Sequence, residues 1–110
     1  MKSKSLDGTP FKVVINNEED DAIIAWGIDN EYQFHSLAVE CAMALHENKN
    51  MEGIIVVEFF ESAYDLEPWS DIYMERDEIE NTLDDAELFF VKVEDYEKAQ
   101  WVKNYRDLIV

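Results

Sequence analysis

Carboxylates are the side chains of this sequence best placed to do chemistry, and they are densest in Asp77–Glu87, which reads DEIENTLDDAE. Six of these eleven residues are acidic, and none is lysine or arginine. Side chains of this type can ligate a cation, act as general acid and base, or contact a basic macromolecule. The surrounding residues favour the third of these roles.

Neither a metal nor a cofactor is expected from the motifs. A calcium-binding loop places acidic residues at alternating positions, followed by a glycine and a final glutamate. The acidic runs NNEEDD and LDDAE both lack that glycine. The chain has only three glycines and no P-loop or dinucleotide-binding motif, so we also expect no phosphate-cradling loop.

Catalysis is not expected either. His35 and Cys41 are six residues apart on a predicted helix, so their side chains point about 120° away from each other and do not suit a catalytic pair. Cys41 lies on the apolar stripe of that helix, which predicts a core position. His46, near the end of the same helix, suits a structural role beside the exposed carbonyl groups. Because no nucleophile motif is present, we predict that the protein is not an enzyme.

The distribution of charge predicts the kind of partner. The chain has 26 acidic and 9 basic residues, a net charge of −17. From Glu61 to Glu97 there are fourteen acidic residues and two basic ones, Arg76 and Lys92. A solubilising surface usually mixes the two signs, so this segregation favours a binding role, while a merely solvated face remains the alternative. Nucleic acid and anionic membranes would be repelled, so the expected partner is a basic, nucleic-acid-binding protein.

A helix is predicted to carry much of the acidic segment. From Trp69 to Leu83 the apolar residues recur at mostly helical intervals, and Pro68 and Ser70 suit the first turn. Acids along one stripe of such a helix would stand roughly 5–6 Å apart, the scale on which charge repeats along a nucleic-acid backbone. These carboxylates could therefore imitate phosphates. The predicted partner-binding residues are Asp71, Glu75, Asp77, Glu78, Asp84, Asp85 and Glu87, with Trp69 as a partly exposed aromatic anchor.

A single domain is predicted for residues 11–110, after a flexible leader at residues 1–10. Short runs rich in β-branched residues predict strands, and three- and four-residue apolar spacing predicts helices. The predicted strands are Phe11–Ile15, Ala22–Trp26, Ile54–Phe60 and Ala86–Val93, and the predicted helices are Tyr32–Glu47, Trp69–Leu83 and Tyr96–Ile109. The first two strands should form a hairpin, and the third should be the middle of the sheet. The fold class is therefore α+β, a β-β-α-β-α-β-α chain with one four-stranded sheet covered by helices.

The apolar segments predict where the protein resides. Runs such as GIIVV and AELFFV fall far short of the roughly 20 residues that a membrane span requires. No apolar stretch follows the first lysines to form a secretion signal, and a single cysteine excludes an internal disulfide. We therefore expect a cytoplasmic protein without membrane contact, and a homodimer remains open.

In composition and size, the whole chain resembles the nucleic-acid-mimic inhibitors that phages and mobile elements deploy against restriction, CRISPR or host transcription factors. The resemblance implies a non-enzymatic acidic inhibitor that occupies the basic nucleic-acid-binding surface of a target protein. Two alternatives stay open. One is an immunity protein for a nuclease toxin, and the other is an acidic chaperone or adaptor that binds a protein partner through an apolar groove.

Overall fold

A computed structural model describes residues 10–16 and 18–109 of the chain. Along the sequence it has strand β1 (Phe11–Val14), helices α1 (Asp20–Asp29) and α2 (Glu31–Glu47), strands β2 (Gly53–Phe60) and β3 (Ser70–Glu75), a turn of 3-10 helix (Arg76–Glu78), and helices α3 (Ile79–Lys92) and α4 (Tyr96–Ile109). The predicted α+β class is confirmed, with three strands in the described part of the chain instead of four. The predicted leader, apart from Pro10, lies outside the described residues.

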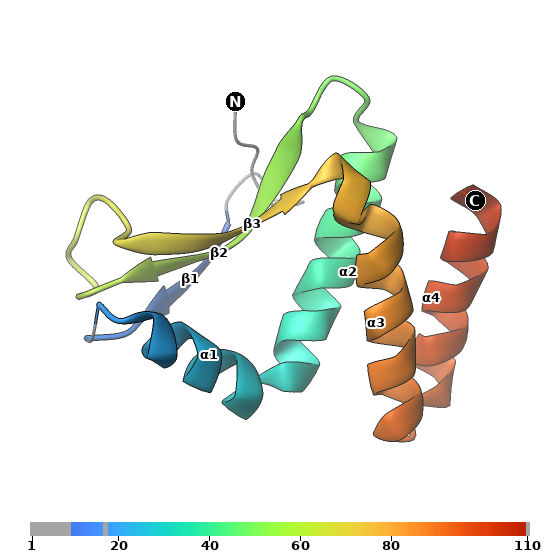
Figure 1. Cartoon of the computed structure of the whole chain (residues 1–110), viewed down its shortest axis with the longest axis horizontal. Coiled ribbons are helices and arrows are strands. Elements are labelled where there is room, and N and C mark those ends of the chain that lie inside the picture. The colour runs from blue at the N-terminus through green and yellow to red at the C-terminus, as the bar shows by residue number, and fades with distance from the viewer. Residues whose placement is uncertain (1–9, 17, 110) are drawn as a thin grey trace.

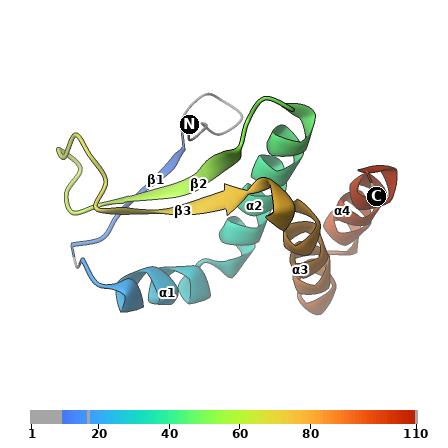
Figure 2. The same ribbon diagram turned by 45° about the horizontal axis from the view of Figure 1, so that its top comes forward.

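β2 is the middle strand of the sheet, as predicted. The strand order is β1-β2-β3, with β1 parallel and β3 antiparallel to β2 (Figure 1). Parallel neighbours need a long crossover connection, and α1 and α2 provide it. Both helices lie on the same side of the sheet, as Figure 2 shows. α3 packs beside α2 and α4 beside α3, so the helix layer extends past the edge of the sheet.

The elements with the strongest patterns are confirmed. The predicted helix Tyr32–Glu47 is α2, which begins one residue earlier, and Tyr96–Ile109 is α4. The predicted strands Phe11–Ile15 and Ile54–Phe60 correspond to β1 and β2, with ends that differ by one residue. Cys41 lies in the core, as its place on the apolar stripe of α2 predicts.

The core fills the space between the sheet and the helix layer. Its fully buried side chains include Leu45 of α2, Phe59 of β2, and Leu83 and Phe90 of α3. Phe59 lies edge-on to Trp26, with ring centroids 5.6 Å apart. This contact ties α1 to the central strand of the sheet.

The segment Ala22–Trp26, predicted as a strand, belongs to α1, so the predicted hairpin is wrong. β1 pairs instead with β2, which follows two helices later in the chain. As a helix, the segment packs Ile23 and Trp26 against the core, while Ile24 and Ile28 are 60% and 64% exposed. A short apolar run of this kind fits a strand or a helix equally well, and only the long-range pairing of β1 decides between them.

β3 takes the first half of the segment predicted as the helix Trp69–Leu83. Ile72 and Met74 alternate along the strand and pair with core residues of β2. This period-two pattern covers only a few positions, so the wider helical spacing around it is misleading. The acidic stripe predicted on that helix does not form, because Asp71 and Glu75 lie on a strand.

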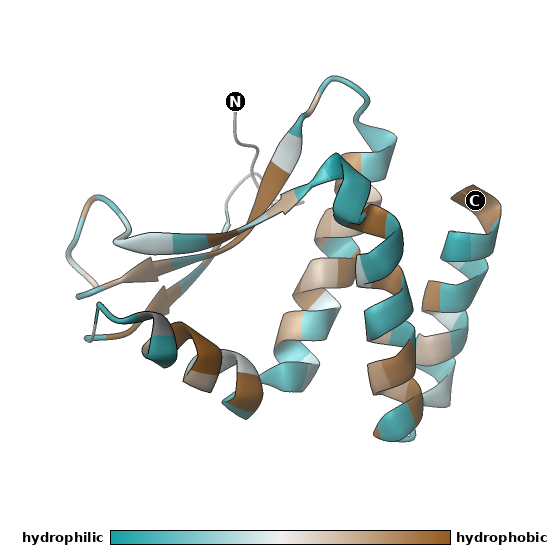
Figure 3. Cartoon of the chain, in the orientation of Figure 1, coloured by the Kyte–Doolittle hydropathy of each residue, from teal (hydrophilic) through white to brown (hydrophobic). Residues whose placement is uncertain are grey.

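α3 continues through the segment predicted as a fourth strand, Ala86–Val93, and that prediction is wrong. Its buried residues Ile79, Leu83, Ala86 and Phe90 follow one another at four, three and four positions, the spacing of one helix face. The run LFFV has strand-like composition, but packing against α2 and α4 stabilises the helix. Figure 3 shows that the second half of α3 is mainly hydrophobic and that its start is mainly hydrophilic.

Candidate functional site: the acidic turn and the α3 groove

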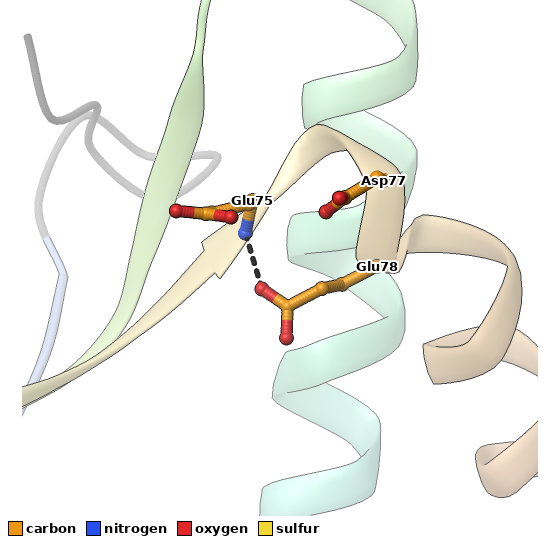
Figure 4. Close-up of side chains that lie close together, drawn as sticks. All are labelled: Glu75, Asp77 and Glu78. Carbon is orange, nitrogen blue, oxygen red and sulfur yellow. Dashed lines mark hydrogen bonds between the residues drawn. The ribbon is translucent and has the colours of Figure 1, made fainter.

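The turn that joins β3 to α3 carries three exposed carboxylates, Glu75, Asp77 and Glu78, which we call the acidic turn. One oxygen from each side chain lies within 4.8 Å of the others. Glu78 reaches back to the end of β3, where its carboxylate accepts a hydrogen bond of 2.7 Å from the Glu75 N–H (Figure 4). This bond satisfies a backbone donor before the helix and helps to fix the turn.

Arg76 lies within the same turn but binds α2. Its guanidinium donates hydrogen bonds to the backbone carbonyl oxygens of Leu45 at 3.0 Å, Asn48 at 2.7 Å and Met51 at 3.2 Å. These carbonyls lie at the C-terminal end of α2 and just after it, where the helix dipole favours a cation. Among the described residues, Arg76 therefore joins α3 to α2 and forms no ion pair with the acidic turn.

The acidic turn is a weak candidate for a metal site. Calcium takes about six to eight oxygen ligands, whereas the turn offers one from each of three side chains. One Glu78 oxygen already accepts the Glu75 N–H. Carboxylates are normally exposed and hydrated on protein surfaces, so this cluster does not by itself indicate a metal.

Two acids of α3 lie on the flank that faces α4. The carboxylates of Asp84 and Glu87 both contact the guanidinium of Arg106, with 2.7 Å between Asp84 Oδ1 and Arg106 Nη1. These hydrogen bonds raise the pKa of the Arg106 guanidinium above its ordinary value. Two of the predicted partner-binding residues are therefore engaged within the molecule.

A groove of about 190 Å³ lies on the other flank, between α3, α2 and β3, and we call it the α3 groove. Its apolar lining residues are Phe34 and Ala38 of α2, Val56 of β2, and Ile72 and Met74 of β3. Its polar lining residues are His35, Tyr73, Glu78, Thr82 and Asp85. Glu78, Thr82 and Asp85 follow one another at four and three positions, so they share one face at the start of α3.

His35 stands beside the α3 groove, with its ring stacked on Phe89 at 4.5 Å between centroids. Burial lowers the pKa of His35 below its ordinary value, opposed by the carboxylates of Glu31 and Asp85. The imidazole is therefore neutral at neutral pH and does not balance the charge of the groove. Within the described part of the chain, no lysine or arginine forms an ion pair with Glu78 or Asp85.

The two remaining predicted site residues lie on or beside the sheet. Asp71 is in β3, directly opposite Glu58 of β2. Trp69 precedes β3, and its half-buried ring packs on Phe59 with centroids 6.1 Å apart. The indole Nε1–H of Trp69 donates to the Ile15 carbonyl at 3.3 Å. Trp69 thus packs against the sheet, away from the acids of α3.

The sequence did not predict the α3 groove, because its walls come from four elements that meet only in the folded chain. The spacing of Glu78, Thr82 and Asp85 is a detectable signal of one helix face. That signal becomes useful only when α3 is known to begin at the acidic turn. His35 carries no sequence signal that would place it beside these acids.

Cys41 and His46 occupy structural positions. Burial raises the pKa of the Cys41 thiol to about 12, so the thiol stays protonated and is a poor nucleophile. His46 lies edge-on to the ring of Tyr105, with centroids 6.1 Å apart, near the end of α2.

Comparisons with protein-family models, with curated proteins and with solved structures found no match for this chain. Within residues 10–16 and 18–109, no helix combines the length and the apolar character needed to cross a membrane. The functional inference therefore rests on the geometry and charge of the acidic turn and the α3 groove.

Proposed function

We propose that this protein is a non-enzymatic acidic inhibitor that binds the basic nucleic-acid-binding surface of a target protein. The observation that carries the proposal is the unbalanced charge that runs from the acidic turn to Asp85. No lysine or arginine in the described part of the chain forms an ion pair with these four carboxylates.

Several basic side chains are engaged in internal contacts instead. Arg76 binds backbone carbonyls at the end of α2, and Arg106 binds two acids of α3. Lys98 donates to the Ser36 hydroxyl at 2.8 Å and lies over the ring of Tyr32. Among the residues that the structure describes, no paired cation offsets the field of the acidic turn, which favours fast association with a basic partner.

Phosphate mimicry is the form of binding that we propose. The acidic turn concentrates three carboxylates within 4.8 Å, and phosphates along one nucleic-acid strand recur at about 3.4 Å of axial rise. A basic site arranged for phosphates could accept the acidic turn in their place. This compact cluster replaces the regular helical array that the sequence predicts.

Competition with nucleic acid tests the proposal. Partners are captured from a cell lysate with the full chain as bait, identified and purified. Each is then mixed with the protein and a labelled duplex on a native gel. We expect the protein to displace the duplex, with an affinity that falls steeply as salt rises from about 50 to 200 mM. A stable ternary complex of protein, partner and duplex would contradict direct mimicry.

A matched pair of charge reversals sharpens this test. The double variant Asp77→Lys with Asp85→Lys changes the proposed surface and spares the hydrogen bond between Glu78 and Glu75. The control, Glu40→Lys with Glu47→Lys, makes the same change in net charge at exposed positions of α2. We expect loss of partner binding only in the first variant. Equal loss in both would mean that net charge, not this surface, attracts the partner.

The apolar lining of the α3 groove favours a second candidate function, an acidic adaptor that binds a protein segment through the groove. Apolar contacts are screened little by salt, so binding would then depend only weakly on ionic strength. Nucleic acid would also fail to compete. The same native gel and salt series separate the two functions.

A further inference from the structure

In the described part of the chain, the α3 groove places an apolar floor beside two carboxylates, Glu78 and Asp85, that form no ion pair with a lysine or arginine. We propose that this groove binds an arginine side chain of the partner protein, with Asp85 as the main acceptor of its guanidinium. The inference rests on the proposed function, because it identifies the residue type by which the basic partner is anchored.

The floor of the groove suits the methylene stem of a long basic side chain. Ala38, Val56 and Met74 are each almost fully buried, so they form a closed apolar base. Phe34 and Ile72 are half-buried and line the groove with them. Arginine packs its methylenes along apolar surface while its head group reaches polar atoms.

The charge at the edge of the groove favours an occupant that is cationic at its tip. Glu78 in the 3-10 turn and Asp85 in α3 both line the groove and are seven residues apart, roughly 10 Å along the helix axis, so they lie at different positions along it. Glu78 is already held by the Glu75 N–H. Asp85 has no such bond among the described residues, and its charge acts on the His35 ring. Asp85 is therefore the freer acceptor.

The aromatic residues at the Asp85 end favour arginine over lysine. Phe34 and His35 both line the groove, and their rings lie 5.7 Å apart between centroids. A guanidinium is planar, stacks on aromatic rings and is more weakly hydrated than an ammonium group. It also binds a carboxylate through two parallel hydrogen bonds.

Titration with capped tripeptides tests the proposal without the natural partner. The ¹⁵N-labelled full chain is titrated with acetyl-Ala-Arg-Ala-amide and followed by NMR. Two matched peptides replace arginine with citrulline, which has the same shape without the charge, or with lysine. We expect saturable shifts of the Phe34, His35, Thr82 and Asp85 amides with the arginine peptide, and affinities about tenfold weaker for citrulline. Equal binding of citrulline, or tighter binding of lysine, would overturn the assignment.

Three single variants locate the binding. Asp85→Asn removes the negative charge and one of the two acceptor oxygens of the proposed site, and should weaken binding of the arginine peptide about tenfold. Thr82→Phe fills the groove without changing the charge and should abolish the shifts. The control Glu80→Gln removes one charge from an exposed position of α3 outside the groove and should change affinity less than about twofold. If Thr82→Phe fails to fold, Asp85→Asn still decides, because unchanged affinity in that variant would overturn the proposal.

Failure of this inference is distinguishable from failure of the proposed function. Partner binding that competes with DNA but survives Asp85→Asn and Thr82→Phe would retain the acidic inhibitor and remove the arginine anchor. Specific arginine-peptide binding in the groove, without a partner that nucleic acid displaces, would retain the anchor and remove the inhibitor.

Discussion

The two flanks of α3 carry the same type of side chain but differ in what opposes their charge. On the flank toward α4, Asp84 and Glu87 hold the Arg106 guanidinium, whose side chain is only 20% exposed. On the flank toward α2, Asp85 and, in the 3-10 turn just before α3, Glu78 border a groove and form no ion pair with a described basic residue. The comparison teaches that acid density along a sequence does not measure the charge that a folded protein presents.

The adjacent residues Asp84 and Asp85 show how this difference arises. Successive residues of a helix point about 100° apart, so a step of one residue places Asp84 and Asp85 on different flanks of the buried stripe. The Asp84 carboxylate belongs to an interhelical ion pair, whereas the exposed Asp85 carboxylate forms no ion pair with a described lysine or arginine. A structural contact and the proposed binding surface would therefore alternate within a single acidic run.

The largest expected effect on stability comes from truncating a side chain in the buried stripe of α3 that separates the two flanks. Leu83 is fully buried between them. The variant Leu83→Ala should lower the free energy of unfolding by about 2–5 kcal/mol, since it leaves a cavity in the core. Urea denaturation measures the loss. A loss below about 1 kcal/mol would show that α3 is not held by this stripe and that its two flanks are not rigidly placed.

Removal of the shared cation should have the next largest effect on stability. In Arg106→Leu, the carboxylates of Asp84 and Glu87 lose their partner and repel each other across a partly buried contact. We expect a lower melting temperature than in the wild type, with partial recovery in moderate salt, which screens the repulsion. Lys103→Leu serves as a control, because its ion pair with Asp107 is exposed at both ends. An equal loss in both variants would remove the distinction between an engaged and a solvated acid.

Smaller effects should follow from neutralising Asp84 and Asp85 one at a time, with one variant affecting stability and the other affecting peptide binding. Asp84→Asn should lower the free energy of unfolding and leave the affinity for the arginine peptide unchanged, because the Asp84 carboxylate forms an ion pair with Arg106. Asp85→Asn should change stability by less than about 0.5 kcal/mol, as expected for a surface substitution, and should weaken the peptide. Thermal melts and NMR titration of both variants measure the pair. The same pattern in both variants would break the comparison between the two flanks.

The smallest expected effect is the pH dependence of stability contributed by His35. Burial holds its folded-state pKa below the ordinary value of 6.5, so the unfolded chain takes up the proton first as pH falls. Above pH 6.5 His35 is mainly neutral in both the folded and the unfolded chain, so it does not reduce stability. As pH falls through 6.5 toward the lower folded pKa, the free energy of unfolding decreases. Melting temperatures at about pH 7.5 and 5.5 should differ more in the wild type than in His35→Phe. An identical difference in both proteins would mean that His35 does not titrate differently on folding.

Local sequence patterns predicted the helices and strands whose apolar spacing or β-branched residues continue over enough positions. α2 and α4 each have several turns of apolar spacing, and β2 has a dense run of β-branched residues, so all three were predicted close to their observed ends. β3 and α1 are short, and their apolar residues fit both periods. Their structures depend on pairing with β2 and packing against Phe59, which are contacts between distant parts of the chain.

Residue types and short-range spacing are enough to predict the net charge of −17, the concentration of acids between Glu61 and Glu97 and the presence of an apolar core. Which of these acids form contacts within the molecule depends on how distant elements pack together. Arg106 reaches Asp84 and Glu87 from a separate helix, and the groove beside Asp85 exists only where α2, β3 and α3 meet. The packing of its buried residues sets how α3 is rotated about its own axis, and therefore which of its acids face α2 and which face α4. That packing depends on the whole fold.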